Sequence, residues 1–355
     1  MKTLISEDSP SSSPAAGSAP RRRFPGLPKI IGFFALIAVL AAGLNKTIDL
    51  GLRRIRTSKY GSLNRIMSGR VNVDIAINGS SRAQFHYDPR IIEQVTGHTA
   101  YNLGMIGARI EVQLAVLRTY LKHNPKPKLV VQNLESFIFT TARKGEIIDP
   151  GLFAPYLNEE DLYKPLVQID PVVWKWKYIP LYVYTVEDGR FLWVRGLLGW
   201  LGKSGPETFY QGFNPNYERW TTDGERFHPS EEKNVILKIE PQAVAALTEL
   251  IQLCRDREID VILVYSPEYF GTQGYVRNRD EIFATFRQIG EKFQVPLWDY
   301  SDSPISRQQE NFYTSTHLNS EGASRFSADF AKRLAEHSTK RLSAARAEDR
   351  RERRP

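Results

Sequence analysis

Three short stretches of the sequence carry residue types that could together perform acyl transfer. They are the "GSS" turn at 79–81, the glycine of "YNLGMIG" at Gly104, and "TSTH" from Thr314 to His317. Serine is a weak nucleophile at its ordinary pKa, so it needs a general base such as histidine within hydrogen-bond reach. Backbone N–H groups near a glycine can stabilise the negative oxygen of the intermediate. Each stretch alone is typical of a polar turn or a surface histidine, so their relative placement carries the prediction.

From about residue 70, the chain alternates between strand and helix patterns. Apolar runs or apolar alternation predict strands in 71–79, 100–104, 128–135, 259–267 and 295–301. Apolar residues at helical spacing predict helices in 87–95, 108–124, 241–258, 280–293 and 319–337. Strands that alternate with helices of this length predict a three-layer α/β/α sandwich around a parallel sheet.

The carboxyl ends of parallel strands meet at one edge of the sheet, which is where such folds place their sites. Ser81 follows the first predicted strand and precedes the first helix, whose free N–H groups favour developing negative charge. Gly104 ends the second strand, and His317 lies just ahead of the final helix. The three residues are therefore expected at the same edge.

In this order, the stretches resemble the sequence blocks of the SGNH (GDSL-type) hydrolase superfamily. The turn at 79–81 resembles its Gly-Asp-Ser block, Gly104 its glycine after the second strand, and Thr314-x-x-His317 its Asp-x-x-His block. The chain is most similar to membrane-anchored, extracytoplasmic SGNH-like proteins linked to acylation of cell-envelope polysaccharide, such as alginate O-acetyltransferase-like proteins. The resemblance spans about 70–338 outside a middle insertion, and it implies a flavodoxin-type sandwich.

The resemblance also implies a role for each matched residue. Ser81 would be the nucleophile, and His317 would act as its general base and then as the acid for the leaving group. The N–H groups of Ser81 and Gly104 would hold the oxyanion. The resulting acyl-serine would pass its acyl group to water or to a sugar hydroxyl. The implied partners are an acylated polysaccharide or sugar and a membrane-bound acyl donor.

Two positions depart from the family pattern. Thr314 occupies the aspartate position, and its hydroxyl cannot offer the charge that stabilises imidazolium. Removal of a triad carboxylate costs on the order of 10⁴ in kcat. The family's asparagine, another oxyanion donor, is not evident, because Asn133 of "VVQNLESF" is expected in the wrong register. Three carboxylates on suitable loops are candidates to support the histidine instead, namely Asp299, Asp302 and Glu268.

Two functions therefore stay open. The first is serine-dependent ester chemistry on cell-envelope or exported polysaccharide, either O-acyl transfer or deacylation, by an enzyme that lacks the usual triad aspartate. The second is a non-catalytic SGNH-like protein that binds polysaccharide or scaffolds an envelope assembly. Intact Ser81 and His317 favour the first, whereas Thr314 favours the second. A distance of about 3–4 Å between Ser81 Oγ and the His317 ring would favour catalysis.

The N-terminal residues have the pattern of a membrane-targeting segment. Residues 1–29 are rich in Ser, Pro and Ala and are expected to form a disordered cytoplasmic tail, and 30–48 contains the apolar run of an anchor or signal segment. A single anchor would hold Arg21–Arg23 inside. A cleaved signal is the alternative, because the small residues at 41–43 could form a cleavage site. Both interpretations place the main domain outside the cytoplasm, in the periplasm or on the cell surface.

The alternation fails in an aromatic-rich insertion at 138–237. It holds five of the six tryptophans, namely Trp174, Trp176, Trp193, Trp200 and Trp220. These side chains could form the core of a cap over the sheet edge, stack on sugar rings, or let "RFLWVRGLLGWLGK" (190–203) touch the membrane interface. The glycines of that segment argue against a stable helix. The segment "YQGFNPNYERW" (210–220) is expected to be a long loop near the active edge.

Charge and cysteine content bear on whether the chain binds nucleic acid, metals or cofactors. The chain has 355 residues and a net charge of +8, of which the tail at 338–355, with seven basic and three acidic residues, supplies +4. This charged tail is expected to be disordered from 339 onward, and no basic groove-reading helix is evident, so nucleic acid is not an expected partner. The single cysteine, Cys254, excludes an internal disulfide and a cysteine metal cluster and is expected to be buried. No metal or nucleotide signature is present, so no cofactor is expected.

Overall fold

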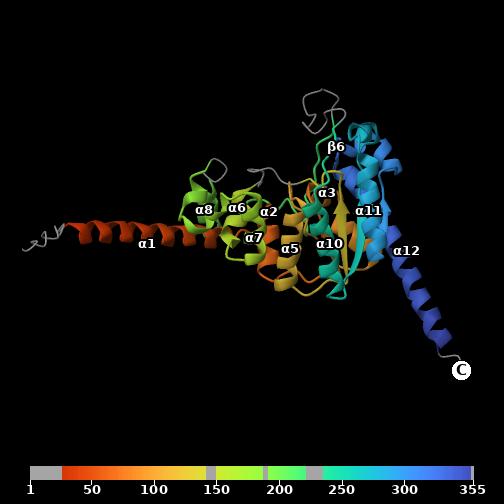
Figure 1. Ribbon diagram of the computed structural model, residues 1–355, viewed down its shortest axis with the longest axis horizontal. Coiled ribbons are helices and arrows are strands. Elements are labelled where there is room, and N and C mark those ends of the chain that lie inside the picture. The colour runs from red at the N-terminus through yellow and green to blue at the C-terminus, as the bar shows by residue number, and fades with distance from the viewer. Residues whose placement is uncertain (1–25, 141–148, 187–190, 221–234, 353–355) are drawn as a thin grey trace, which may run out of the picture.

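The computed structural model describes residues 26–140, 149–186, 191–220 and 235–352 and shows a mixed α/β sandwich (Figure 1). Five parallel strands form one sheet in the order β2-β1-β3-β4-β5. The strands are β1 Ile75–Asn78, β2 Ala100–Asn102, β3 Leu129–Leu134, β4 Asp260–Tyr265 and β5 Leu297–Asp299. The predicted three-layer α/β/α class is confirmed, although β1 is shorter than the alternating pattern at 71–79.

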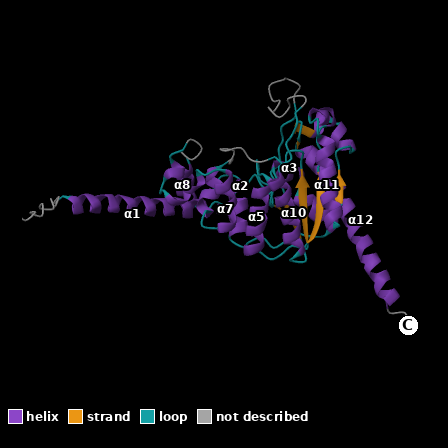
Figure 2. Ribbon diagram, viewed as in Figure 1, coloured by secondary structure: helices purple, strands orange, loops and turns teal. Residues whose placement is uncertain are grey.

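Helices cover both faces of the sheet (Figure 2). On one face lie α5 (Ile110–His123), α10 (Pro241–Arg255) and α11 (Arg279–Phe293), and on the other lie α4 (Pro89–Thr96) and α12 (Ser320–Glu352). Neighbouring strand residues point to opposite faces, so Ala76 joins the first core and Ile77 the second. The buried Cys254 belongs to the first core, as predicted.

Capping residues set where the helices around the site begin. Asp88 caps α4 by accepting a hydrogen bond from the Arg90 N–H at 3.0 Å, and Pro89 takes the first helical position. Asn319 caps α12 by accepting from the Gly322 N–H at 3.0 Å. Helix α12 then continues through Glu352, whereas the sequence predicted disorder from 339 onward. The Ala, Arg and Glu residues of this tail are good helix formers, which is consistent with its helical path.

The remaining helices, the 3-10 turns and a short hairpin complete the described chain. The helices are α1 Leu27–Leu52, α2 Ser58–Met67, α3 Ser81–His86, α6 Pro150–Phe153, α7 Glu160–Ile169, α8 Val173–Tyr178 and α9 Leu192–Trp200. The 3-10 turns are η1 Ala154–Tyr156, η2 Tyr182–Tyr184, η5 Phe270–Tyr275, η6 Pro304–Arg307 and η7 Gln309–Asn311. A two-stranded antiparallel hairpin joins β6 Phe312–Thr314 to β7 His317–Leu318.

Helix α1 projects from the body of the molecule (Figure 1). Nearly all of its residues up to Thr47 are exposed, whereas Ile48, Gly51 and Leu52 at its end are buried. Among the described residues it is the one helix long and apolar enough to cross a membrane. At about 1.5 Å per residue, its 26 residues extend about 39 Å, which exceeds the core of a bilayer. The predicted anchor or signal segment at 30–48 therefore lies within a longer continuous helix.

The glycines of the segment at 190–203 do not prevent a helix, so that prediction was wrong. Gly196 and Gly199 lie in α9, where they press against the end of α1. A Cβ on Gly199 would come within 2.0 Å of the Gly51 carbonyl oxygen, and one on Gly51 within 2.0 Å of the Gly196 oxygen. The two backbones approach closely because these side chains are absent. The contact between helices outweighs the low helix propensity of glycine.

The tryptophans of the insertion do not form a shared core. Trp176 is buried, and Trp220 is half-buried. Trp174, Trp193 and Trp200 are 39% to 50% exposed. Three of the five tryptophans therefore keep much of their surface exposed, whereas other aromatic side chains of the insertion, such as Phe153 and Tyr156, lie in the core.

Candidate active site

The turn that carries Ser81 lies at the carboxyl end of β1. The strand ends at Asn78, Ser80 caps α3, and Ser81 is the first residue of that helix. A Cβ on Gly79 would come within 2.7 Å of the Ala83 Cβ and 2.9 Å of the Asn133 Cβ. Only glycine therefore fits between β3 and α3, and this close approach fixes where the serine hydroxyl points.

His317 reaches this serine from the β6–β7 hairpin. The Oγ of Ser81 lies 2.8 Å from Nε2 of His317, and Nδ1 lies 2.8 Å from Thr314 Oγ1 and 3.2 Å from Thr316 Oγ1. If Ser81 donates to Nε2, then Nδ1 carries the ring proton and donates to a threonine hydroxyl. This is the tautomer in which an imidazole can take the serine proton. The distance of 2.8 Å between Ser81 Oγ and His317 Nε2 is shorter than the expected limit of about 3–4 Å and lies within hydrogen-bond reach, which favours catalysis.

Aromatic rings fix the orientation of the imidazole. Tyr313 stacks on the His317 ring with centroids 5.4 Å apart and planes at 24°. The buried Phe85 meets the same ring edge-on at 5.7 Å. Packing thus does part of the positioning that a carboxylate does in the usual triad.

A second histidine, His86, lies beneath the site and was not predicted. Its Nε2 accepts a hydrogen bond from the Leu318 N–H at 3.1 Å, so its Nδ1 carries the proton and donates to Ser266 Oγ at 2.9 Å. Burial, followed by the charges of Arg82 and His317, holds the pKa of His86 well below its usual value. The neutral ring therefore ties the hairpin strand β7 to helix α3 and to the loop after β4.

The three carboxylates considered as substitutes for the triad aspartate have other partners. Glu268 is buried, where it accepts from the Tyr265 hydroxyl at 2.8 Å and pairs with Arg279 at 3.0 Å and Arg82 at 3.4 Å. The other two lie at the surface of the neighbouring loops: Asp299 accepts from the Ser301 N–H, and Asp302 pairs with Arg307. The group placed at Nδ1 is the Thr314 hydroxyl.

The Arg82 side chain continues the buried network under the serine turn. Its guanidinium is 2% exposed and donates to the carbonyl oxygens of Ser266 and Pro267. On the other side of the turn, Glu135 accepts from the Ser80 hydroxyl at 2.8 Å. Burial raises the pKa of Glu135, against the opposing charge of Arg82. These groups hold the turn from both sides and leave the Ser81 hydroxyl for His317.

Gly104 lies directly beside helix α3. A Cβ at this position would come within 2.5 Å of the Gln84 backbone nitrogen, so the loop after β2 can approach the serine helix only with glycine. The N–H of Gly104 donates to Asn102 Oδ1 at 2.9 Å, and the Asn102 amide donates to the Ala83 carbonyl at 2.7 Å. Asn102 is therefore a buried partner of the predicted oxyanion donor that sequence reasoning missed.

The Asn133 amide, which was not expected to serve as an oxyanion donor, is hydrogen-bonded within the protein core. It is buried at the end of β3, where its Oδ1 accepts from the Tyr87 hydroxyl at 2.9 Å and its amide donates to the Leu134 carbonyl at 3.2 Å. Its role is therefore to hold Tyr87 and the strand end beneath the serine turn.

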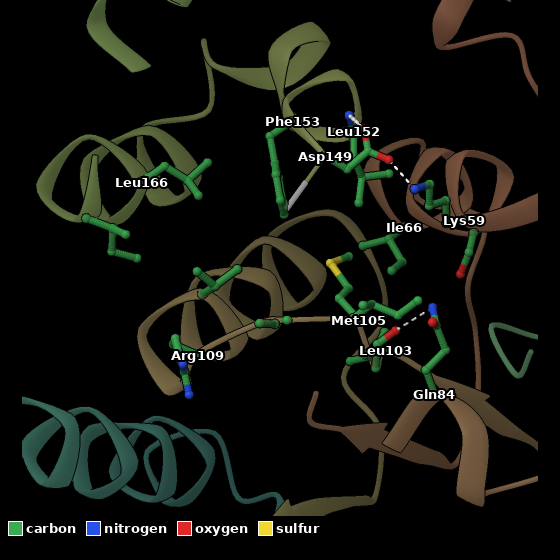
Figure 3. A pocket seen from close by; sticks show the side chains of 17 residues that line it. Lys59, Ile66, Gln84, Leu103, Met105, Arg109, Asp149, Leu152, Phe153 and Leu166 are labelled. Carbon is green, nitrogen blue, oxygen red and sulfur yellow. Dashed lines mark hydrogen bonds and ion pairs between the residues drawn. The ribbon is translucent and has the colours of Figure 1, made fainter. Parts of the chain in front are cut away.

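Figure 3 shows a pocket that Gly104 helps to line. Its cavity volume is about 90 Å³. A Lys59–Asp149 ion pair lies on its wall, and the Gln84 amide donates to the Gly104 carbonyl at 3.2 Å. The remaining wall is mostly apolar, from Ile66, Leu103, Met105, Val112, Leu152, Phe153 and Leu166. An apolar group joined to a carbonyl near Gly104 would fit here.

The loop predicted near the active edge lies there. The backbone of Asn214 donates to the Gln84 carbonyl at 3.0 Å, and the N–H of Trp220 donates to the Phe312 carbonyl at 3.0 Å. Between these contacts Tyr217 is 79% exposed. The loop thus runs from the serine helix to the histidine hairpin.

Comparison with known proteins assigns no family. No family model matches the chain, and no curated protein matches it. Nineteen chains of solved structures match, among them a "putative acylhydrolase" from Bacteroides fragilis that is 11% identical, with a TM-score of 0.35. That match covers 74% of this chain and 87% of the other. A similarity this low leaves the activity of the chain to be judged from its own residues.

Proposed function

We propose that the chain is an SGNH-type enzyme in which Ser81 performs ester chemistry, either O-acyl transfer or deacylation. The observation that carries the proposal is the 2.8 Å contact between Ser81 Oγ and His317 Nε2, two residues 236 positions apart in the chain. A contact between a nucleophile and a base whose second nitrogen is oriented in turn is the signature of an activated serine.

In the proposed reaction, Ser81 Oγ attacks the carbonyl carbon of an ester while His317 Nε2 takes the hydroxyl proton. The bond between the carbonyl carbon and the alcohol oxygen of the ester then breaks, and the imidazolium gives its proton to the departing alcohol oxygen. An acyl-serine remains. Water or a sugar hydroxyl attacks the acyl-serine with the same proton transfers in reverse. Throughout, the Nδ1 proton stays in its hydrogen bond to Thr314 Oγ1.

Two backbone N–H groups are the proposed oxyanion donors. The Ser81 N–H lies at the first turn of α3, and the Gly104 N–H already donates to Asn102 Oδ1. An ionised oxygen accepts hydrogen bonds about twice as strong as a neutral amide oxygen does. We expect the oxyanion to compete with Asn102 for the Gly104 N–H as charge develops.

The pocket beside Gly104 (Figure 3) is the proposed seat of the acyl group, because its apolar wall begins at the proposed oxyanion donor. The acceptor would lie on the opposite side, along the loop at 210–220, where the exposed Tyr217 can stack on a sugar ring. The resemblance to envelope acylation proteins supports a cell-envelope or exported polysaccharide as that acceptor. It also supports a membrane-bound protein as the acyl donor.

Helix α1 is the proposed membrane anchor, with the domain on the extracytoplasmic side. Its exposed apolar length and the basic cluster Arg21–Arg23 support this orientation. Single engineered cysteines at Ser9 and at Glu258 test it in intact cells with a membrane-impermeant maleimide, because the native Cys254 is buried. Labelling at 258 alone supports the proposal, labelling at 9 alone reverses the orientation, and a shortened chain indicates a cleaved signal.

A fluorophosphonate probe tests the chemistry on the full chain in detergent. Ser81→Ala and His317→Ala should abolish labelling, whereas Ser68→Ala, which removes an exposed hydroxyl just after α2, should retain it. Thermal melting of each variant establishes that it is folded. Labelling that survives Ser81→Ala would remove this serine from the role of nucleophile.

The second candidate function is a non-catalytic SGNH-like protein that binds polysaccharide or scaffolds an envelope assembly. The observation that favours it is the neutral Thr314 hydroxyl at the position where a charged carboxylate usually supports the base. Absence of labelling in a folded wild-type chain, together with retention on an immobilised polysaccharide, would support this function over catalysis.

A further inference from the structure

The outer face of helix α9 is apolar although it is not covered by the described protein. Leu192, Gly196 and Gly199 of this helix are buried toward the domain. Six large apolar side chains on the rest of the helix and at its two ends are 38% to 74% exposed, namely Phe191, Trp193, Leu197, Leu198, Trp200 and Leu201. We call these six residues the α9 face. A cluster of exposed apolar residues of this kind marks an interaction site.

The position of α9 along α1 indicates what covers this face. The Trp200 indole N–H donates to the Thr47 carbonyl at 2.9 Å, and Gly196 and Gly199 press against Gly51. On α1, the apolar run ends at Leu44 and is followed by Asn45 and Lys46. Helix α9 therefore lies beside the point where the candidate span turns from apolar to polar. That is the depth of a membrane–water interface, where tryptophan is enriched.

Next to the α9 face is a pocket with an unusual concentration of arginine. It holds about 1360 Å³ of empty space including its mouth. Its walls come from the end of α1, from α2 and from residues 199–204, and they carry five arginines: Arg53, Arg54, Arg56, Arg65 and Arg70. The Arg54 guanidinium lies 3.8 Å above the Trp200 ring, so the arginine pocket begins where the α9 face ends.

Positive charge in the arginine pocket exceeds the negative charge around it. Arg65 has Glu207 at 3.9 Å, and two of its guanidinium nitrogens are buried without a hydrogen-bond partner. Arg53 donates to the Pro155 carbonyl. Across the described part of the chain, Arg54, Arg56 and Arg70 form no ion pair.

We propose that the arginine pocket binds the phosphate of an anionic membrane phospholipid while the α9 face inserts among the acyl chains beside α1. A phospholipid places an anion directly above apolar chains, and the pocket and the face place cations directly above apolar side chains. Arginine matches phosphate because its planar guanidinium can donate two parallel hydrogen bonds. The proposal rests on α1 as the membrane anchor and is independent of the chemistry of Ser81.

The pocket is tested by titrating the full chain in detergent with short-chain phosphatidylglycerol, short-chain phosphatidylcholine and inorganic phosphate. We expect phosphatidylglycerol to bind at least tenfold more tightly than the other two. Replacing the exposed pair Arg56→Gln and Arg70→Gln should weaken that binding at least fivefold, whereas Arg287→Gln on α11 should not change it. Equal affinity for phosphatidylglycerol and phosphatidylcholine would overturn the proposal. An unchanged affinity for phosphatidylglycerol in the double variant would also overturn it. Inorganic phosphate that binds as tightly as phosphatidylglycerol would overturn it too and assign the pocket to a free anion.

The α9 face is tested on the full chain in lipid nanodiscs that contain bromine-labelled acyl chains, which quench nearby indoles. Trp193→Phe should remove a quenched component of the fluorescence, whereas Trp298→Phe in the buried sheet should remove only unquenched signal. Both changes keep an aromatic ring, so the fold is expected to survive. If the Trp193 variant loses the same fluorescence with brominated as with unlabelled lipid, Trp193 is not quenched, and α9 lies in water. Fluorophosphonate labelling of the same samples reports on Ser81 separately.

Discussion

The replacement Thr314→Asp tests how much a negative charge at Nδ1 of His317 adds to catalysis. In the structure the Thr314 hydroxyl lies 2.8 Å from Nδ1 of His317, and an aspartate at the same site can place a carboxylate oxygen within the same reach. Ser81 and the rings that pack on His317 are unchanged by the replacement. The variant therefore isolates the value of one negative charge at Nδ1.

The size of the effect follows from the charge separation. An imidazolium and a carboxylate about 4 Å apart attract by about 4 kcal/mol at an effective dielectric constant of about 20. Because Thr314 and His317 are both half-buried, solvent screens part of this attraction. About 2 to 4 kcal/mol of transition-state stabilisation corresponds to a gain of about 30-fold to 10³-fold in kcat. This gain is smaller than the loss of about 10⁴ when a triad carboxylate is removed from an intact triad.

The assay is hydrolysis of a p-nitrophenyl ester by the full chain between pH 5 and pH 9. The carboxylate also favours the protonated imidazole, so the acid limb of the pH–rate profile should move to higher pH in Thr314→Asp. Thr314→Asn is the matched control, because it has a similar shape and no charge. The expected gain from a carboxylate at position 314 is refuted if the folded Asp variant has a kcat no higher than that of the wild type. It is also refuted if the Asn variant has the same kcat as the Asp variant.

Three further outcomes are expected. His86→Leu should cost about 1 to 3 kcal/mol of unfolding free energy, because leucine has no acceptor for the buried Leu318 N–H, as measured by chemical denaturation at pH 8. The neutral buried ring of wild type has a lowered folded pKa, so the unfolded chain binds a proton first as pH falls. Stability should thus drop by about 1.4 kcal/mol per unit below about pH 6.5, and this dependence should be absent in the Leu variant. Gly199→Leu should release α9 from α1, because even its Cβ meets the Gly51 oxygen. Protease cleavage near 190–203 should rise while Leu197→Ala on the outer face leaves it unchanged. Val112→Phe should fill the pocket beside Gly104 and lower kcat/KM for a butanoyl ester about tenfold relative to an acetyl ester, since each of the two additional methylenes contributes about 0.8 kcal/mol when buried. An unchanged ratio would place the acyl chain elsewhere.

The sequence could predict the meeting of Ser81 and His317 because the rule that governs it is topological. Parallel strands joined by helices bring their following loops to one edge, so two residues 236 positions apart become neighbours once the strands are recognised. The caps Asp88 and Asn319 depend on equally simple geometry, since a cap bonds to N–H groups only two or three residues away.

The remaining parts of the site depend on contacts that no local pattern encodes. His86 looks like a residue of a short polar helix, and its role appears only when β7 and the loop after β4 pack on either side of its ring. Asn102 is likewise an ordinary strand residue until the Gly104 loop folds over it. The glycines of α9 argue against a helix by propensity alone, and the partner that reverses this, Gly51, lies far away in the chain.

The glycine seam between α1 and α9 also has a mechanical consequence for a membrane-anchored chain. Helix α1 passes from its exposed length into the folded body without a flexible tether, and only residues 53–57 separate it from α2. If α1 is the membrane anchor proposed above, the anchor and the domain tilt together, and Ser81 is held at a constant height above the bilayer. An enzyme held in this way could not follow a polymer substrate by itself. The polymer would have to move past Ser81, and that movement would set the spacing of the modified units.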